Sequence, residues 1–393
     1  MESNQLPNVM VAGAHSMGAL GVIRSLGKAG YIVHAASESS NETCFRSNYA
    51  HHRVIHPSGD KPEFKEWFEN YVDTYNIKLI IPGGPISPGG HSIIDRYMHL
   101  FPVKNDANIL AKSNKYELFE SLLSESEQSE HLPPITLVNL NMELPTERNL
   151  SKLGCPLFIK LDRVHSINDQ GDQVIRLDTA IEAFSCLSEL KTNYKKAVVQ
   201  GFVQGSGVGV FLLRWDGVIK AKFMHRRLHE MPHTGGASSL RESWWHDKIL
   251  KDAEANLSRI NWEGVAMIEY RWDCNTDEFY LMEMNLRFWG SLHLAIYSGV
   301  DFPKLLADAF FGHDFAPNPK PEIGVKCRNT IPGEIGYIVS LWRDKNVSLF
   351  RKFYSILELI WLSLDFRVKN DLLFPGDRKI FFYRLMQFLK TGQ

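Results

Sequence analysis

Short apolar runs alternate with amphipathic stretches over the first hundred residues. The runs NVMVAG, YIVHAAS and IKLIIPGG are typical of buried strands, while LGVIRSLGKAG and residues 63–76 show helical spacing. This alternation predicts a parallel sheet flanked by helices, with ligands near the loops that follow the strands. The loop Gly13–Gly18 leads into a helix N-terminus, which suits an anion. It does not match the dinucleotide pattern GxGxxG, and an ordinary turn is the alternative.

From residue 155 to 290 the pattern changes to a succession of strands, with helical stretches at about 178–191 and 245–260. The strand-like runs are CPLFIKLD, QVIRL, AVVQGFV, VGVFLLRW, VIKAKFMHRR, GVAMIEYRW and EFYLMEMNL. Their hairpin-like order predicts an antiparallel sheet domain with helices to one side. A polar helical segment at 104–128 and an irregular stretch with three prolines come before it, so we place a domain boundary near residue 110.

The end of the chain carries an apolar segment in a basic context. From residue 343 onward, lysine and arginine outnumber aspartate and glutamate about two to one. The segment FYSILELIWLSLDF is strongly apolar but shorter than the roughly 20 residues that a membrane span needs. We predict a buried packing helix, and the alternative is a helix that rests on a membrane surface.

Composition narrows the class of protein. With 393 residues, 44% of them hydrophobic, the chain can bury more than one core. The formal net charge of -1 gives no reason to expect nucleic acid as a partner. The segment MESNQLPNVMVAG lacks the features of a secretory signal, and the five cysteines show no CxxC spacing. We therefore expect reduced thiols and a cytoplasmic location.

The segment FYLMEMNLRFWG, residues 279–290, places polar residues within an apolar strand. Alternation along a strand predicts one core face and one polar face. The core face would hold Tyr280, Met282, Met284 and Leu286, and the other face Leu281, Glu283, Asn285 and Arg287.

A neighbouring strand supplies a second carboxylate. The run GVAMIEY is apolar until Glu269, and the turn-like RWDCNTDE separates it from the strand that carries Glu283 and Asn285. If the two strands form a hairpin, Glu269 and Glu283 approach each other on one face. Two carboxylates and an amide oxygen make an all-oxygen site that suits magnesium. The alternative is a solvated sheet face on which acids are ordinary.

Other residues are candidates for binding a nucleotide. Lys160 lies at the end of a buried strand, where a lysine can hold a phosphate as a point charge. Lys115 lies on a predicted helix, with an ordinary surface lysine as the alternative. Adenine would be lined by the backbone of Gln200, Gly201, Phe202 and Val203. The glycines at 205, 207 and 209 lead into a strand and not a helix, which argues against a dinucleotide fingerprint.

The motif His229-Glu-Met-Pro-His233 matches HExxH, but we do not expect zinc there. That chemistry needs both histidines on one helical face, and Pro232 within the motif costs roughly 3 kcal/mol in a helix interior. The stretch HRRLHEMPHTGGASSLRES instead predicts a strand end that feeds a polar loop. The loop would close over phosphates, with a plain surface loop as the alternative. Its anion contacts would be His225, Arg226, Arg227 and Arg241.

In combination, these segments resemble the ATP-grasp superfamily. The resemblance is strongest to the bacterial carboxylate–amine ligase branch, whose ATP-binding domain is similar to that of carbamoyl-phosphate synthetase. It covers roughly residues 8–315 and implies a pre-ATP-grasp-like domain at 1–110, an ATP-grasp domain at 111–315 with subdomains at about 111–205 and 206–315, and a helical C-terminal extension at 316–393. The matching stretches, in family order, are SLGKAGYIV, SNKYELFE, PLFIKLD, VVQGFVQGSGVGVF, HRRLHEMPHTGGASSLRES, GVAMIEYRWD and YLMEMNLRFWGSLHLA.

The resemblance implies a role for each matching residue. Lys115 and Lys160 would contact the ATP phosphates, and residues 200–203 would form the hinge that reads adenine. Arg287 would meet the transferring phosphate or an acyl-phosphate. The expected catalytic residues are Arg287, Arg226 and Arg227. The magnesium ligands would be Glu269, Glu283 and Asn285, with Glu283 bridging two ions.

Members of this family usually activate a carboxylate as an acyl-phosphate, which an amine then attacks as ADP and phosphate are released. The resemblance therefore implies an ATP-dependent ligase that forms C–N bonds, with ATP and two Mg²⁺ ions as cofactors. Its partners would be a small-molecule carboxylate and an amine, and a homodimer is compatible with the sequence. The acceptor candidates are an amino acid, a small metabolite or a uronic-acid unit of a surface polysaccharide.

The sequence departs from the family at two places. Gly207 stands where many members carry an acid that contacts ribose, and the loop RVHSINDQGDQ after Lys160 is less rich in glycine than the usual phosphate-covering loop. Two alternatives stay open beside the ligase. One is an ATP-binding module without turnover, and the other is an ATP-dependent phosphotransferase.

Overall fold

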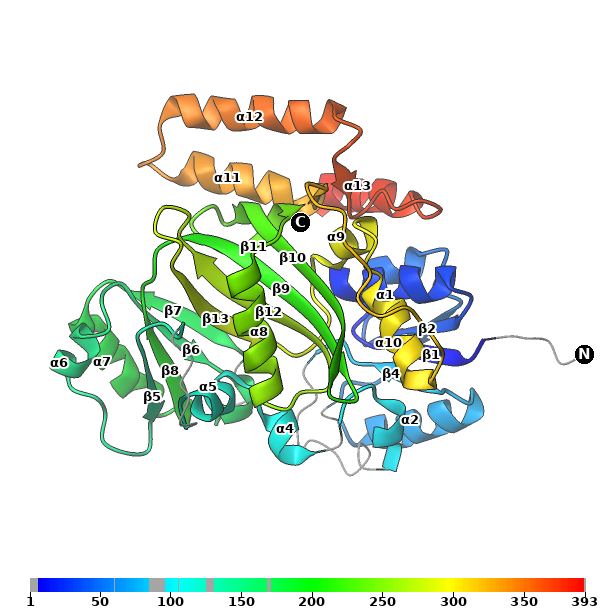
Figure 1. Ribbon diagram of the computed structural model, residues 1–393, viewed down its shortest axis with the longest axis horizontal. Coiled ribbons are helices and arrows are strands. Elements are labelled where there is room, and N and C mark those ends of the chain that lie inside the picture. The colour runs from blue at the N-terminus through cyan, green and yellow to red at the C-terminus, as the bar shows by residue number, and fades with distance from the viewer. Residues whose placement is uncertain are drawn as a thin grey trace, which may run out of the picture.

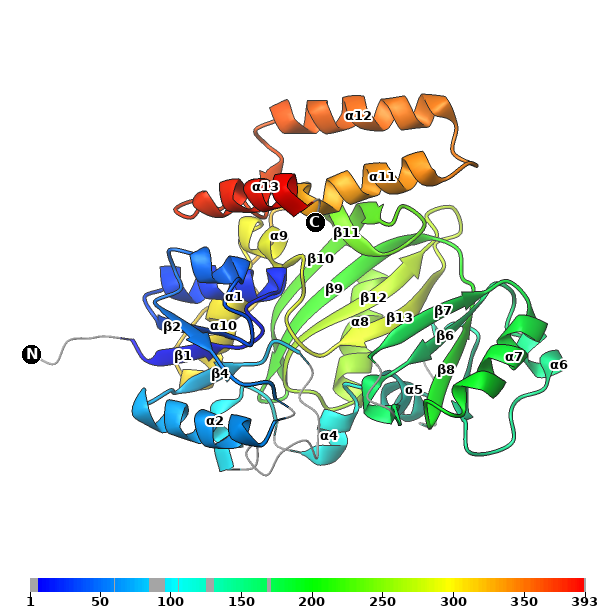
Figure 2. The same ribbon diagram turned by 180° about the vertical axis from the view of Figure 1, so that it is seen from behind.

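The computed structural model describes residues 6–59, 61–84, 96–104, 106–124, 131–167 and 171–391. These residues form a parallel sheet, two antiparallel sheets and a group of helices at the C-terminal end (Figures 1 and 2). The predicted mixed architecture, with an N-terminal parallel α/β unit, antiparallel sheets and C-terminal helices, is confirmed.

The N-terminal unit is a four-stranded parallel sheet in the order β3-β2-β1-β4. Its strands are β1 (Asn8–Val11), β2 (Ile32–Ser37), β3 (His52–Ile55) and β4 (Leu79–Ile81), and its helices are α1 (Met17–Lys28), α2 (Pro62–Thr74) and the short 3-10 turns η1 (Thr43–Arg46) and η2 (Met98–Leu100). The edge strand β3 was not predicted, because Val54 is the one buried residue in its four.

The small antiparallel sheet has the order β5-β8-β6-β7 and carries Lys160 and the hinge. Its elements are β5 (Ile135–Asn139), β6 (Leu157–Leu161), β7 (Gln173–Leu177), β8 (Lys196–Gly201), α6 (Glu147–Ser151), α7 (Ala180–Leu190) and η3 (Arg163–His165), preceded by α4 (Ala107–Ala111) and α5 (Lys115–Ser124). Strand β5 lies in the stretch that looked irregular in sequence. It is held by antiparallel pairing with β8, which sequence periodicity does not reveal.

The large sheet has seven strands in the order β13-β12-β9-β10-β11-β14-β15. Their bounds are β9 (Ser206–Trp215), β10 (Val218–Met231), β11 (Ala237–Ser243), β12 (Gly264–Trp272), β13 (Phe279–Asn285), β14 (Lys326–Arg328) and β15 (Lys369–Asn370). The helix α8 (Asp247–Arg259) packs on one face, and the opposite face carries the polar residues of interest.

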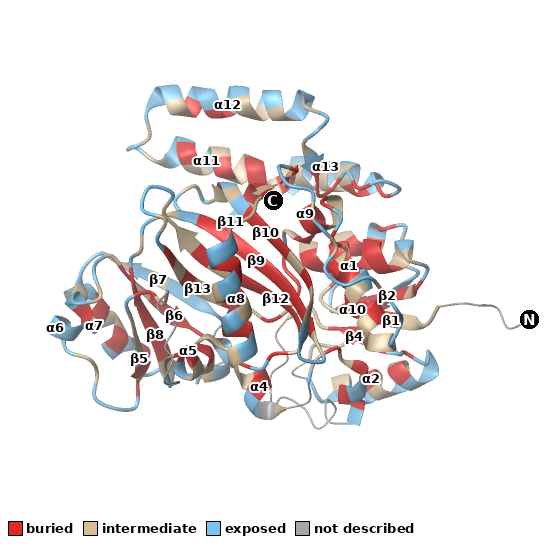
Figure 3. Cartoon of the chain, in the orientation of Figure 1, coloured by how far each residue is buried: buried red, intermediate tan, exposed pale blue. Residues whose placement is uncertain are grey.

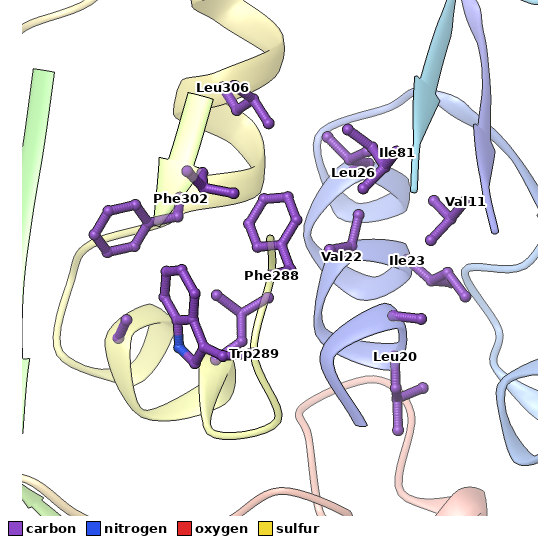
Figure 4. Packing of buried hydrophobic residues seen from close by; sticks show 14 of the residues in the cluster. Val11, Leu20, Val22, Ile23, Leu26, Ile81, Phe288, Trp289, Phe302 and Leu306 are labelled. Carbon is purple, nitrogen blue, oxygen red and sulfur yellow. The ribbon is translucent and has the colours of Figure 1, made fainter. Parts of the chain in front are cut away.

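One hydrophobic core joins the N-terminal unit to the large sheet. Figure 4 shows Val22 of α1 facing Phe288, with Trp289 next to Phe288, and both aromatic residues follow β13. A Cβ at Gly18 would lie 2.9 Å from the Trp289 carbonyl oxygen, so α1 approaches this loop as closely as a glycine permits. The contact fixes the segment that carries Arg287. The helices α9 (Leu292–Tyr297) and α10 (Phe302–Phe311) complete the core.

The stretch 225–243 is a hairpin and not the predicted loop. Strand β10 continues to Met231, and β11 pairs with it antiparallel, with Arg227 opposite Arg241. The turn contains Gly235 at a φ of 129°. Sequence periodicity missed β11 because its polar side chains pair with residues of neighbouring strands. The two histidines of the HExxH motif accordingly lie on a strand and a turn and not on one helix.

The C-terminal extension contains the π-helical turn η4 (Thr330–Glu334) and the helices α11 (Ile335–Arg343), α12 (Leu349–Leu364) and α13 (Lys379–Thr391). The prediction of a buried packing helix at FYSILELIWLSLDF is wrong. In α12 only Lys352 and Ser355 are buried, and most of its apolar residues are exposed (Figure 3). Among the described residues, no helix is long and apolar enough to cross a membrane.

His229 connects the large sheet to this extension. Its Nδ1 lies 3.1 Å from Glu334 Oε2 and its Nε2 lies 3.4 Å from Glu358 Oε1 on α12, while Tyr337 stacks on the ring. Burial disfavours the charged imidazolium, but the hydrogen bonds to Glu334 and Glu358 outweigh it and raise the pKa of His229 to about 9.

We expect this pair of contacts to make stability pH-dependent. A raised histidine pKa contributes stability that is fully present below the unfolded value near 6.5 and is lost as pH rises through about 9. The loss should be on the order of 2 kcal/mol. Urea unfolding of the wild type and of His229→Gln, at intervals from pH 6 to 10, measures it. The difference between the two proteins should shrink over that range, and a constant difference would contradict the assignment.

Candidate active site

The β12–β13 hairpin places Glu269 directly opposite Glu283. The predicted approach of the two carboxylates is confirmed by this register. A β-bulge interrupts the pairing, because Tyr270 is opposite Leu281 and Met282 is the extra residue. The bulge shifts the alternation by one residue, so Leu281 packs in the core and Met282 does not. The predicted faces of Tyr280, Leu281 and Met282 were wrong, whereas Glu283 and Asn285 share the site face.

A chain of polar contacts surrounds the two carboxylates. The amide Nδ2 of Asn285 donates to Glu269 Oε1 at 3.1 Å, and Arg287 Nη2 donates to Asn285 Oδ1 at 3.3 Å. The guanidinium of Arg227, on β10, forms an ion pair with the other oxygen of Glu269. The structure thus brings Glu269, Glu283, Asn285, Arg287 and Arg227 to one place, as the sequence led us to expect.

Two lysines reach the hairpin from outside the large sheet. Lys160, on β6, donates from Nζ to the Met282 carbonyl at 2.9 Å. Lys115, at the start of α5, has its Nζ 3.8 Å from Glu283 Oε1 and 3.1 Å from Asp162 Oδ1. The bulge therefore presents the Met282 carbonyl to Lys160. The space between the two antiparallel sheets is bounded by both cations and both acids.

Burial and charge act together on these groups. Burial and the nearby Glu269 raise the pKa of Glu283. Burial lowers the pKa of Lys160. Burial also opposes the charge of Lys115, but Glu283 and Asp162 outweigh it and raise the pKa of that lysine. A carboxylate with a raised pKa gains from a second positive charge nearby, which is the environment a divalent cation provides.

The donors present suit a hard cation. Glu269, Glu283 and Asn285 offer carboxylate and amide oxygens, the ligands that Mg²⁺ prefers. Within the described part of the chain, no group of three His, Cys, Asp or Glu residues is placed to hold a metal without other ligands. The third ligand in this set is accordingly an amide, and the Asn285 side chain would have to release Glu269 and turn its oxygen inward.

A cavity of about 410 Å³ adjoins the acids on the same face of the sheet. Its lining reaches from the hairpin to β10, β11 and Asp371 of the C-terminal extension. The charged groups are three guanidinium groups and three carboxylates, and the charged and polar lining consists of Arg227, Arg241, Arg287, Glu269, Glu283, Asp371, His225, Ser238, Asn285, Ser291 and Asn329. The guanidinium groups are suited to bind an anionic group there.

Three predicted anion contacts are placed differently. Arg226 points to the opposite face of β10, where it pairs with Glu242 at 2.6 Å, so the structure does not bring it into the site. Arg241 is buried in an ion pair with Asp371. His225 lines the cavity, but burial, with Arg227 and Arg241 nearby, holds its pKa well below the ordinary range, and the ring is neutral.

The hinge residues lie at the end of β8. The side chain of Gln200 is fully buried, and neither atom of its amide has a partner among the described residues. The Gly201 N–H donates to the Pro134 carbonyl at 2.8 Å, so it is not free for a ligand. Phe202 is half exposed and Val203 is partly buried. A buried amide without a partner is a group that a polar ligand or an ordered water can satisfy.

Glu230 is a site residue that sequence reasoning missed. A Cβ at Gly207 would lie 2.7 Å from Glu230 Oε1, so the carboxylate of β10 fills the space beside that glycine. It is held by Arg227 Nη1 at 3.1 Å and lies 3.6 Å from Arg271 Nη1. A carboxylate of β10 thus lies beside the position at which the resemblance leads one to expect an acid. This proximity depends on the pairing of β9 with β10, which local sequence patterns do not reveal.

Replacing Gly207 by alanine tests whether that space matters. The added methyl would meet the Arg227 and Glu230 side chains, which can move, so the fold should persist with a change in stability within about 1 kcal/mol. Moving Arg227 away from Glu269 should raise the KM for ATP several-fold. Initial-rate kinetics and thermal melts measure both effects. Unchanged kinetics together with an unchanged melting temperature would contradict the arrangement.

A larger cavity of about 810 Å³ lies at the carboxyl ends of the parallel strands. It includes Gly13 and His15 from the loop after β1, where the sequence predicted a ligand, and has an aromatic wall of Phe64, Trp67 and Phe68. The location agrees with the general rule for parallel sheets.

Comparison with known proteins agrees with this geometry. Residues 195–331 match the family described as ATP-grasp in the biosynthetic pathway with Ter operon. The fold is similar to N5-carboxyaminoimidazole synthetase from Staphylococcus aureus, with a TM-score of 0.60 and 16% identity over 82% of each chain. It is also similar to L-amino acid ligase from Bacillus licheniformis, with a TM-score of 0.57 and 14% identity over 78% of this chain and 75% of that one.

A third similar fold is biotin carboxylase from Campylobacter jejuni, with a TM-score of 0.56 and 14% identity over 82% of this chain and 74% of that one. Comparison with the curated proteins by sequence gives no match. The match over residues 195–331 and the similarity in fold agree with the resemblance to the ATP-grasp superfamily drawn from the order of the motifs.

Proposed function

We propose that this chain is an ATP- and Mg²⁺-dependent carboxylate–amine ligase that works through an acyl-phosphate. The observation that carries the proposal is the meeting of Glu269, Glu283 and Asn285 on one hairpin with Lys115 and Lys160 from the opposite side. Phosphoryl transfer needs charge neutralisation and positioning more than a protein nucleophile, and this cluster supplies both.

We place ATP between the two antiparallel sheets, within a domain at 111–315 that follows an N-terminal domain at 1–110. Its phosphates would be held by Lys115 and Lys160, and its adenine would lie along residues 200–203, with the buried Gln200 amide as a polar contact. Glu230 is suited to the ribose contact that Gly207 cannot make. Support comes from the similar synthetase of Staphylococcus aureus, which has also been solved in complex with ADP.

Glu269, Glu283 and Asn285 would hold the magnesium ions. When bound, these ions neutralise charge on the β- and γ-phosphates as the phosphoryl group transfers. Before that, the acids are paired with cations of the chain, Glu283 with Lys115 and Glu269 with Arg227. On nucleotide binding we expect both cations to turn from the carboxylates to phosphate oxygens.

The cavity of about 410 Å³ would receive the two substrates. A substrate carboxylate oxygen attacks the γ-phosphorus, the bond to the bridging oxygen breaks, and ADP leaves. Arg227 and Arg287, which line the cavity, are placed to bind the carboxylate and then the acyl-phosphate. The amine nitrogen next attacks the acyl carbon and phosphate leaves. The proton that the amine gives up leaves with the departing phosphate, because burial and the two neighbouring guanidinium groups make His225 a weak base.

The lining favours a small, polar carboxylic acid. Three guanidinium groups and the carboxylates of Glu269, Glu283 and Asp371 line the cavity, so an acid that also carries an ammonium group fits its mixed charge pattern. We propose an amino acid or a small metabolite as the acid, with a uronic-acid unit of a surface polysaccharide as the larger candidate.

A screen of acid–amine pairs tests the proposal. The purified chain is incubated with ATP, Mg²⁺ and pairs drawn from amino acids, small metabolites and uronic acids, and ADP, phosphate and product masses are measured. The expected result is ADP release that requires both partners and a product that has lost one water and contains no phosphorus. A stable phosphorylated product would show a phosphotransferase. Binding of ATP without turnover across the panel would show a nucleotide-binding module.

A further inference from the structure

Helix α12 has the reverse orientation of an ordinary surface helix. Its polar side chains face the protein. Arg351 donates to the Tyr337 hydroxyl of α11 at 2.6 Å, Glu358 contacts His229, and Ser363 accepts from Arg328 at 3.0 Å. Lys352 and Ser355 are buried on the same side. The opposite side, which we call the outer face, carries the apolar residues Leu349, Phe350, Phe353, Leu357, Ile360, Trp361 and Leu364.

The outer face is exposed to an unusual degree. Phe350 is 81% exposed and Trp361 is 70% exposed, and Phe366, just beyond the helix, is 95% exposed. Figures 1 and 2 show α12 as the outermost element at its end of the molecule, with α11 between it and the large sheet. A contiguous apolar face of this size is a feature of interaction sites. The polar contacts on its other side hold this orientation in place.

The side chains around the outer face are predominantly basic, which indicates the kind of surface that it contacts. From residue 343 to the end, ten lysines and arginines stand against five acids. Two of those acids, Asp371 and Asp377, are buried in ion pairs with arginines that precede the extension. The exposed surface of this segment is therefore more basic than the numbers of basic and acidic residues alone indicate. Exposed cations lie on both sides of the helix, with Arg343 and Lys345 before it and Lys369 after it.

We propose that the outer face of α12 docks the protein on an anionic lipid surface, with the helix lying in the plane of the membrane. Helices of this kind place Trp, Phe and Leu at the acyl boundary and keep basic groups at the headgroups. Tyr354 and Trp361 are the residue types enriched at that interface. A second copy fits less well, because two such faces brought together by a twofold axis would set basic rims against each other.

Vesicle flotation of the full chain tests this inference independently of any ligase activity. Phosphatidylcholine vesicles are used with and without phosphatidylglycerol, at low and high salt. We expect the chain to float with the anionic vesicles, and added salt to weaken binding. The double substitution Phe353→Ser/Trp361→Ser should lower the bound fraction by at least about tenfold. Arg343→Gln/Lys345→Gln should lower it several-fold.

The matched control is Met142→Ser/Ile181→Ser, which removes two exposed apolar side chains from the small-sheet region and should leave flotation unchanged. All of these side chains are exposed, and the ring contact that is removed is that of Phe353 with Trp342 on α11, so thermal melts should differ little. The inference is overturned if the wild type stays unbound with anionic vesicles at low salt. It is also overturned if the α12 variant binds as the wild type does, or if light scattering shows a dimer that Phe353→Ser/Trp361→Ser dissociates while no vesicles are bound.

Discussion

Replacing Glu283 by glutamine is expected to lower Mg²⁺-dependent ADP formation by about a thousandfold or more. Glu283 faces Glu269 across the hairpin and lies 3.8 Å from Lys115, at the point where both sheets and the cavity meet. The amide keeps the shape but removes the negative charge, and a neutral group is a much weaker ligand for Mg²⁺. Steady-state ADP release measures the loss in turnover.

Glu278→Gln is the matched control, since Glu278 lies beside the same strand but is exposed. It should retain wild-type turnover. A second readout separates binding from chemistry. The thermal stabilisation that Mg²⁺ and ATP together produce in the wild type should be small in Glu283→Gln and unchanged in the control. The metal assignment fails if Glu283→Gln keeps more than half of the wild-type rate or of that stabilisation.

Replacing Asp377 by alanine is expected to destabilise the fold by roughly 3–5 kcal/mol. Its carboxylate is fully buried and accepts from Arg24 Nε at 2.9 Å, from the Ser47 hydroxyl at 2.7 Å and from the Asn48 N–H at 2.8 Å. Removing it leaves the guanidinium of Arg24 buried with its ion pair broken. Asp377 comes from the C-terminal extension and Arg24 from α1, so the loss should loosen the extension from the N-terminal unit.

Urea unfolding measures the change in the free energy of unfolding. Asp365→Ala is the control, because Asp365 in the same extension pairs with Arg367, which is exposed to solvent. It should leave the midpoint essentially unchanged. If Asp377→Ala unfolds at the same urea concentration as Asp365→Ala, the buried pair is not what holds the extension in place.

Local sequence patterns predicted the elements that have a strong apolar period. The strands that carry Lys160, Glu269 and Glu283 were each visible as apolar runs, and the turn-like segment between the last two predicted their pairing. The site could be outlined from sequence because its polar residues interrupt those runs. The superfamily followed from the order of the segments, since no single one of them is specific.

What sequence could not predict depends on contacts between distant segments. The bulge at Met282 changes which side chains face the core, and no local signal marks it. Glu230 lies beside Gly207 because β9 pairs with β10 in the observed register. Arg226 and Arg227 are equivalent in the sequence, yet strand alternation sends one to Glu242 and the other to Glu269. The outward orientation of α12 likewise arises from His229 and Tyr337, which lie elsewhere in the chain.

The transfer of oxygen from the acid to phosphate tests the proposed ligase most directly. An acid that supports ADP formation is labelled with ¹⁸O in its carboxylate and incubated with ATP, Mg²⁺ and the amine, and the released phosphate is analysed by mass spectrometry. An acyl-phosphate pathway predicts phosphate that carries one ¹⁸O atom from the acid for each amide formed. Phosphate without the label, or ¹⁸O retained in a phosphorylated product, would contradict it.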